Sequence, residues 1–92
     1  MKFDWDKNKA EINKIKYLVS FDEAQTVFYD FLSITISDPI HSINEERLIT
    51  IGMSSKNRLL IVVHTEKNET IRIISSRLAT KIERKIYEEE KY

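Results

Sequence analysis

The run of five aliphatic residues from Leu59 to Val63 limits the possible folds of this chain more than any other feature. Such a run is typical of a strand that is buried on both faces, and it therefore needs strand neighbours and a layer on each side. Two flanking segments, 46–53 and 70–75, are rich in β-branched residues and are separated from it by short polar connections. Together the three segments predict an antiparallel β-meander with residues 59–63 at its centre.

Further elements are predicted on either side of this meander. Residues 33–37 alternate between polar and apolar side chains, as in a half-buried strand, and residues 2–5 fit a short edge strand. A lysine-rich helix is expected over residues 6–16. A second helix begins at the capping box of Ser20 and Glu23, and its apolar face comprises Ala24, Val27, Phe28 and Phe31. An apolar stripe predicts a C-terminal helix buried through Ala79, Ile82 and Ile86. The predicted fold class is α+β, an antiparallel β-meander with two N-terminal helices and a C-terminal helix.

Composition limits the chemistry that is available. At 92 residues and 41% hydrophobic content, the chain suffices for one modest core, so residues 1–92 are expected to form a single domain. There is no cysteine, and two histidines without clustered carboxylates are poor material for a metal site, so no metal or cofactor is expected. No apolar run is long enough to cross a bilayer, and the N-terminus lacks the layout of a secretory signal. We therefore expect a cytoplasmic protein without a membrane partner.

The formal net charge is zero, but the charges are unevenly distributed. Residues 71–87 carry five basic side chains and only one acidic side chain, Glu83, and every arginine of the chain lies at or after position 47. The guanidinium group is planar and permanently charged, and it matches a phosphate better than a lysine ammonium does. Phosphate recognition is therefore expected in the second half of the chain.

Three of these residues are expected to converge in one cleft. Arg77 lies at the end of the last predicted strand, and Arg84 and Tyr87 lie three residues apart on the flank of the C-terminal helix. Arg47 and His64 could join them from neighbouring strands.

Other readings of the same residues stay open. Strand alternation places Arg72 on the face opposite Arg77 unless the strand bulges between them. Lys81 and Lys85 equally fit a solvated helix face, His64 a structural histidine, and Tyr87 an aromatic residue at the edge of the core. From the residues alone, the chain is a small α+β domain with a basic patch.

Several tracts in series match the pattern of a known protein family. In the first half they are Phe3-Asp4-Trp5-Asp6 and Val19-Ser20-Phe21-Asp22-Glu23-Ala24. In the second half they are Ile51-Gly52-Met53-Ser54, the segments 60–66 and 71–77, and Glu83-Arg84 ahead of Tyr87-Glu88. In this order and spacing the tracts resemble the BrnT toxins of bacterial type II toxin–antitoxin modules, and the resemblance covers nearly the whole chain. One departure stands out, because the family usually has Lys-His-Gly where this chain has Lys16-Tyr17-Leu18.

The resemblance implies a RelE-like fold and a ribonuclease neutralised by a BrnA-like ribbon-helix-helix antitoxin, with operator DNA bound only through that complex. Metal-independent RNA cleavage by the ribose 2′-OH needs a proton acceptor, a proton donor and cations for the developing charge. We therefore predict that the catalytic residues are Arg77, Arg84, His64 and Tyr87, that Glu46 is a fallback for proton transfer, and that the RNA-binding residues are Arg47, Arg72 and Lys81. The missing histidine keeps two alternatives open: a weak or inactive relative that acts as an antitoxin-binding co-repressor, and a small nucleic-acid-binding module.

Overall fold

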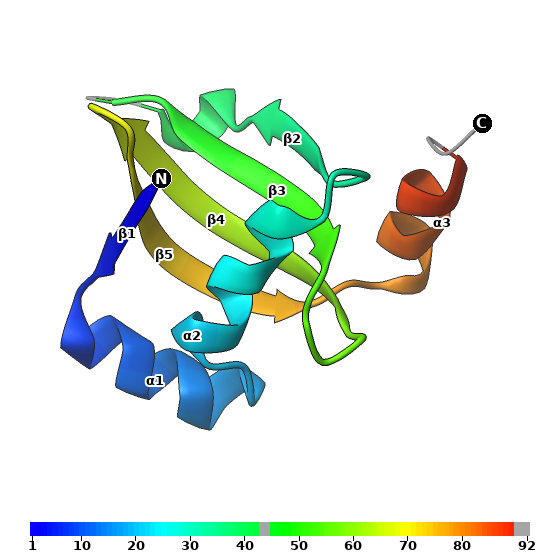
Figure 1. Cartoon of the computed structure of the whole chain (residues 1–92), viewed down its shortest axis with the longest axis horizontal. Helices are drawn as coiled ribbons and strands as arrows, with labels where there is room; N and C mark the ends of the chain where they lie inside the picture. Colours follow the sequence, from blue (N-terminus) through cyan, green and yellow to red (C-terminus); the bar gives the residue numbers. More distant parts are fainter. Residues whose placement is uncertain (43–44, 90–92) are drawn as a thin grey trace.

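Five strands form one sheet in the order β1-β5-β4-β3-β2 (Figure 1). The computed structural model describes residues 1–42 and 45–89. The strands are β1 (Lys2–Trp5), β2 (Ile34–Ser37), β3 (Arg47–Met53), β4 (Leu59–Lys67) and β5 (Thr70–Leu78). Strands β2 to β5 pair antiparallel in chain order, and β4 is central, as the apolar run predicts. The purely antiparallel meander is corrected at one edge, where β1 pairs parallel with β5 because no hairpin joins these two strands.

A bulge in β5 changes which side chains share a face. Val63 pairs with Ser75 and His64 pairs with Ile73, so one extra residue, Ile74, lies in β5 between these partners. Arg72 consequently pairs with Thr65, and Arg77 pairs with Ile61, four residues away on β4. Residues four apart on a regular strand point to the same face, so Arg72 and Arg77 share a face.

Two helices and a 3₁₀ turn cover one face of the sheet, which we call the helix-covered face (Figure 1). They are α1 (Lys7–Tyr17), α2 (Phe21–Ala24) and η1 (Gln25–Tyr29). Here Val19, Phe21 and Val27 pack with strand residues that include Leu60, Val62 and Ile73. The chain's single glycine, Gly52, allows this packing, because a Cβ at that position would lie 3.1 Å from the Cβ atoms of both Val27 and Ser33.

The second predicted helix is shorter than expected and ends differently. The Ser20 hydroxyl caps it by accepting from the Glu23 N–H at 3.0 Å, as predicted, but the Glu23 carboxylate accepts from Ser54 and Arg58 rather than completing the capping box. However, the α-helix ends at Ala24, and η1 leads to a turn in which Asp30 Oδ1 accepts from the Leu32 N–H at 3.0 Å. This turn carries Phe31 away from the core, and its side chain is 94% exposed. The prediction that Phe31 belongs to the buried face is therefore wrong.

The opposite face of the sheet, which we call the open face, carries little cover. Helix α3 (Lys81–Glu89) lies beyond the ends of β3 and β5, away from α1 and α2 (Figure 1). It packs there mainly through Tyr87 in a cluster with Ile51, Leu59 and Ile61. The predicted stripe is wrong for Ile82 and Ile86, which are 75% and 44% exposed, because α3 packs through Tyr87 instead; only Ala79 is partly buried against this cluster. None of the described helices is long and apolar enough to span a bilayer. A short 3₁₀ turn, η2 (Pro39–His41), follows β2.

Candidate functional site

Arg77, at the end of β5, is held by a carboxylate from α3. Its Nη1 and Nη2 atoms donate to the two oxygens of Glu83 at 2.7 and 2.8 Å. The Arg77 hydrogen bonds lower the pKa of Glu83 to about 2, and the same contact raises the pKa of Arg77. Glu83 also accepts from the Thr80 N–H at 2.8 Å, and the Glu83 N–H donates to the Thr80 hydroxyl, so the pair forms a capping box at the start of α3. The guanidinium is thus oriented while the side chain stays 42% exposed.

Arg77 and Glu83 lie at a hollow of about 270 Å³, which we call the open-face hollow. Its lining is mostly aliphatic and comes from four strands, with polar groups from β5, α1 and α3. The residues that line it are Tyr17, Ile36, Ile49, Ile51, Ile61, Val63, Ser75, Ser76, Arg77, Glu83 and Ile86. An apolar hollow with a few converging polar groups is the usual form of a small-ligand site.

Tyr17 reaches this hollow because α1 runs along a free edge of β5. Strand β1 ends at Trp5, opposite Ile73. Beyond that point Asn13 takes the place of a strand, since its side chain donates to the Ser76 carbonyl at 2.8 Å and accepts from the Ser76 N–H at 3.0 Å. Tyr17 follows Asn13 by four residues and therefore lies on the same side of the helix. Our sequence predictions did not include Tyr17 or Asn13 in the site, although the departure at position 17 is a signal that points there.

A second cationic group lies on the open face, farther along β4. Arg47, Thr65 and Arg72 are directly paired across β3, β4 and β5, so their side chains share the face of Arg77. The two arginines are about 10 Å apart along this row, because neighbouring strands are spaced by about 4.8 Å. Arg72 donates to Asp4 Oδ1 at 3.0 Å across an exposed ion pair. Within the described residues, Arg47 has no side-chain ion pair.

His64 lies on the other side of the sheet and is fully buried. Its Nε2 atom is 2.7 Å from the Thr50 hydroxyl, and its ring packs edge-on against Phe28 with centroids 4.8 Å apart. Burial lowers the pKa of His64 to about 4, so the ring is neutral at neutral pH. This position fits a structural histidine and gives the ring no access to a phosphate, which removes the geometric basis for the predicted role in proton transfer.

The structure does not bring Arg77, Arg84 and Tyr87 together. Tyr87 is buried, its hydroxyl donates to Asp30 Oδ2 at 2.6 Å, and burial together with this contact raises the pKa of Tyr87 to about 12. Arg84 and Lys81 are exposed on α3 and do not line the open-face hollow. The expected convergence is corrected because Glu83, and not Arg84, is the helix residue that faces Arg77.

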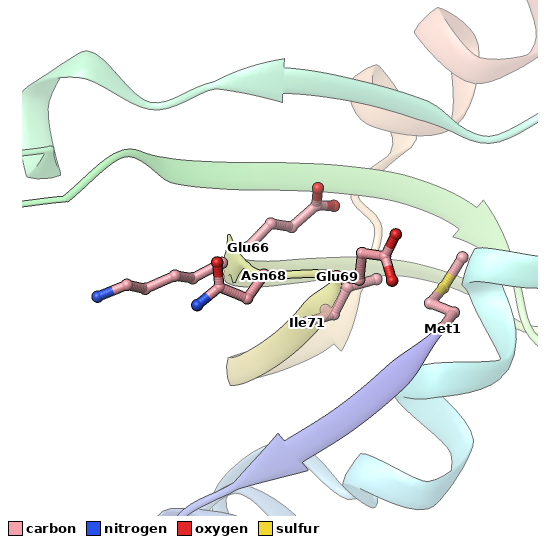
Figure 2. Close-up of a pocket in the computed structure, with 6 residues that line it drawn as sticks. Met1, Glu66, Asn68, Glu69 and Ile71 are labelled. Atoms are coloured by element: carbon pink, nitrogen blue, oxygen red, sulfur yellow. The ribbon is translucent and has the colours of Figure 1, made fainter.

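A larger hollow, of about 580 Å³, lies at the β4–β5 hairpin and the N-terminus (Figure 2). Among its lining residues are Glu66, Lys67 and Glu69, and Figure 2 shows both carboxylates at this end of the sheet. The two carboxylates do not suit a phosphate ligand. This hollow is also at the opposite end of β5 from Arg77, so size alone does not mark the site. Across residues 1–42 and 45–89, no three His, Asp or Glu side chains gather as metal ligands would.

Comparison with known proteins identifies the family. The family model described as the ribonuclease toxin BrnT of type II toxin–antitoxin systems matches residues 5–83. The chain belongs to the BrnT family. Its structure is similar to the crystal structure of the Brucella abortus ribonuclease toxin BrnT, with a TM-score of 0.65 and 29% sequence identity, over 88% of this chain and 99% of that chain. A comparison with curated proteins gave no match.

Family membership assigns this chain to the ribonuclease toxins of type II systems, and such a toxin has an RNA substrate and an antitoxin partner. The stretch that matches the BrnT model contains Tyr17, Arg47, Arg72, Arg77 and Glu83. Arg84 and Tyr87 lie just beyond it.

Proposed function

We propose that this BrnT family member is an endoribonuclease that cleaves RNA on its open face without a metal ion. The observation that carries the proposal is the placement of Arg47, Arg72 and Arg77 on the one sheet face that α1 and α2 leave uncovered. Three guanidinium groups on an accessible face can neutralise several phosphates of one strand.

The cleavage step needs little beyond oriented charge. The ribose 2′-OH loses its proton and bonds to the adjacent phosphorus, the bond to the 5′-oxygen breaks, and that oxygen takes up a proton. The products are a 2′,3′-cyclic phosphate and a 5′-hydroxyl end. Arg77 is the residue that stabilises the charge on the phosphate oxygens, because its double contact with Glu83 fixes its orientation in advance. Arg47 and Arg72 hold flanking phosphates, and Lys81 contacts RNA that extends over α3.

The site offers fewer groups for proton transfer than for the stabilisation of negative charge. His64 is buried and Tyr87 has a pKa of about 12, so neither supplies a group that titrates near neutral pH. Glu46 is exposed and accepts from the Ser37 hydroxyl at 3.2 Å, which leaves it as the fallback. This placement of His64 and Tyr87 favours a second candidate function, a weak or inactive relative that acts as an antitoxin-binding co-repressor.

The antitoxin in our proposal is a BrnA-like ribbon-helix-helix protein, through which the pair binds operator DNA in the cytoplasm. Ile36 and Ile86 line the open-face hollow and are 53% and 44% exposed, and Ile82 of α3 is 75% exposed. Exposed aliphatic side chains beside a cationic face suit a protein that covers the face and blocks RNA. We propose in addition that the fold is RelE-like.

The test is an RNA cleavage assay in excess EDTA with wild-type protein and the single variants Arg77→Ala and Arg84→Ala. Loss of Arg77 is expected to slow cleavage by about 100-fold, the usual cost of one oriented donor to a transition-state charge. Arg84→Ala is the matched control and is expected to change the rate by less than about threefold, in line with its exposed position.

Two outcomes decide between the candidate functions. Cleavage only in the presence of a divalent metal would contradict metal independence. No cleavage by the wild type, together with tight binding to the cognate antitoxin, would contradict the ribonuclease and support the co-repressor.

A further inference from the structure

We propose that the open-face hollow binds one nucleobase of a single-stranded RNA, with the Tyr17 ring as the surface on which that base packs. This inference deepens the proposed function and rests on it for the identity of the ligand as RNA. It adds a base-binding subsite, and a residue for it, to a face that so far holds only phosphate contacts.

The hollow has the composition that a base requires. The lining from β2, β3 and β4 is aliphatic and includes Ile49, Ile61 and Val63, and the polar side chains come from Ser75, Ser76, Arg77, Glu83 and Tyr17. A nucleobase is flat and largely apolar on its faces, with hydrogen-bonding groups along its edges. Aliphatic walls with a few polar groups fit both parts of such a ligand.

Tyr17 supplies the aromatic surface. It is 37% exposed, so the ring is accessible without any movement of the fold. It lines the same hollow as Arg77 and Glu83. The Lys16 ammonium lies 5.2 Å from the centre of the Tyr17 ring and adds a cation at this position. An aromatic ring next to cations is the usual arrangement at which proteins bind single-stranded nucleic acid.

The charges around the hollow favour RNA over an apolar protein segment as its occupant. Arg77 lies at the hollow and pairs with Ile61 of β4. The Arg47–Thr65–Arg72 row crosses β4 at Thr65, which is four residues farther along that strand. That separation is about 13 Å along the strand, because each residue advances by about 3.3 Å. A single strand with phosphates at both cationic positions would place a base over the apolar surface between them. The bases of a duplex are paired and stacked, so the strand that fits here is single.

The test is a binding cycle with short single-stranded 2′-O-methyl RNAs, which cannot be cleaved because the attacking hydroxyl is blocked. One oligonucleotide is intact, and each of the others lacks the base at one position. Affinities are measured for the wild type, Tyr17→Phe and Tyr17→Leu. Because Tyr17 is at the surface, the variants are expected to keep the wild-type melting temperature, which is recorded for each.

For the wild type we expect one position at which removal of the base weakens binding by about tenfold, the usual effect of losing one stacked base. Tyr17→Phe should keep this difference, because the ring remains. Tyr17→Leu should reduce it to about twofold or less, because the aliphatic side chain fills similar space but offers no ring. Equal affinity for all the oligonucleotides, or a base dependence that survives in Tyr17→Leu, would overturn the inference. Binding of the antitoxin but of no oligonucleotide would also overturn it, since the face would then serve only a protein partner.

These outcomes are separate from those of the cleavage assay. Coupling between Tyr17 and one base, without cleavage of unmodified RNA, would support the subsite and contradict the ribonuclease. Cleavage without such coupling would support the ribonuclease and overturn the subsite.

Discussion

The two faces of the sheet differ in how they hold their polar side chains. On the side of α1 and α2, Asn13, Glu23 and His64 are each at most 4% exposed, and all three make hydrogen bonds. On the open face, Arg72 and Arg77 are 50% and 42% exposed, and each has one acidic partner. Buried polar groups that are hydrogen-bonded hold a fold together, whereas exposed cations are available to a ligand. The same residue type, arginine, serves both purposes in this molecule.

Arg58 shows what an arginine does on the structural side. It donates to both carboxylate oxygens of Glu23 in α2 and to the Leu18 carbonyl, at 3.0 Å for the latter. The Ser54 hydroxyl also donates to Glu23, at 2.7 Å. These contacts connect the β3–β4 hairpin to the start of α2, and they lower the pKa of Glu23, chiefly through the Arg58 hydrogen bonds.

The largest expected effect is on stability, from Arg58→Ala. This change leaves the Glu23 carboxylate buried without its cation, so we expect the free energy of unfolding to fall by about 3–4 kcal/mol. Arg47→Ala is the matched control on the open face, and it should change the same quantity by less than about 0.5 kcal/mol. Urea denaturation of both variants measures the difference. An equal loss of unfolding free energy in the two variants would show that the open-face arginine matters as much for stability as Arg58 does.

The second prediction concerns pH and His64. The pKa of His64 is about 4 in the folded protein, compared with a normal value of 6.5, so the unfolded chain takes up a proton more readily. The contribution of a neutral His64 to stability is complete above pH 6.5 and is lost as the pH falls towards 4, by on the order of 3 kcal/mol. His64→Gln cannot titrate, and its stability should change much less over this range. Thermal unfolding at a series of pH values provides the measurement, and parallel curves for the two proteins would refute a buried neutral histidine.

The smallest expected effect is a gain in stability from Leu18→Gly. Leu18 ends α1 in the left-handed conformation, with φ at 58°, and its side chain is 74% exposed. A β-carbon is unfavourable there, and little packing is lost with the side chain, so we expect a gain of about 1 kcal/mol. Asn57 also has φ at 58° and is the control, because asparagine tolerates this conformation and Asn57→Gly should gain less. A loss of stability in Leu18→Gly, measured by urea denaturation, would mean that the Leu18 side chain packs against something in solution.

Much of the fold follows from local patterns in the sequence. The apolar run predicts the central strand, and the turn residues around it predict the order of β3, β4 and β5. The bulge at Ile74 does not follow, because it depends on the pairing between β4 and β5. Strict alternation along β5 would place Arg72 and Arg77 on opposite faces of the sheet. The bulge places both on the open face.

The site is harder to predict than the fold, because it depends on how α1 and α3 are oriented. The position of Glu83 in the capping box with Thr80 could be read from spacing, but its selection over Arg84 as the neighbour of Arg77 requires the orientation of α3. Tyr17 and Leu18 are the positions at which the sequence resemblance leads us to expect His-Gly. The structure explains both positions, one as part of the open-face hollow and the other as a left-handed helix end.

The most direct test of the division between the two faces is the salt dependence of binding to an uncleavable single-stranded 2′-O-methyl RNA. Each phosphate contact on a single strand contributes about 0.7 to the slope of log affinity against log salt concentration. We expect Arg47→Ala with Arg72→Ala to reduce that slope by about 1.4, whereas Lys7→Ala with Lys14→Ala, an equal loss of charge from α1, should leave it unchanged. A slope that falls equally in both double variants, or only in the lysine variant, would contradict the assignment of RNA to the open face.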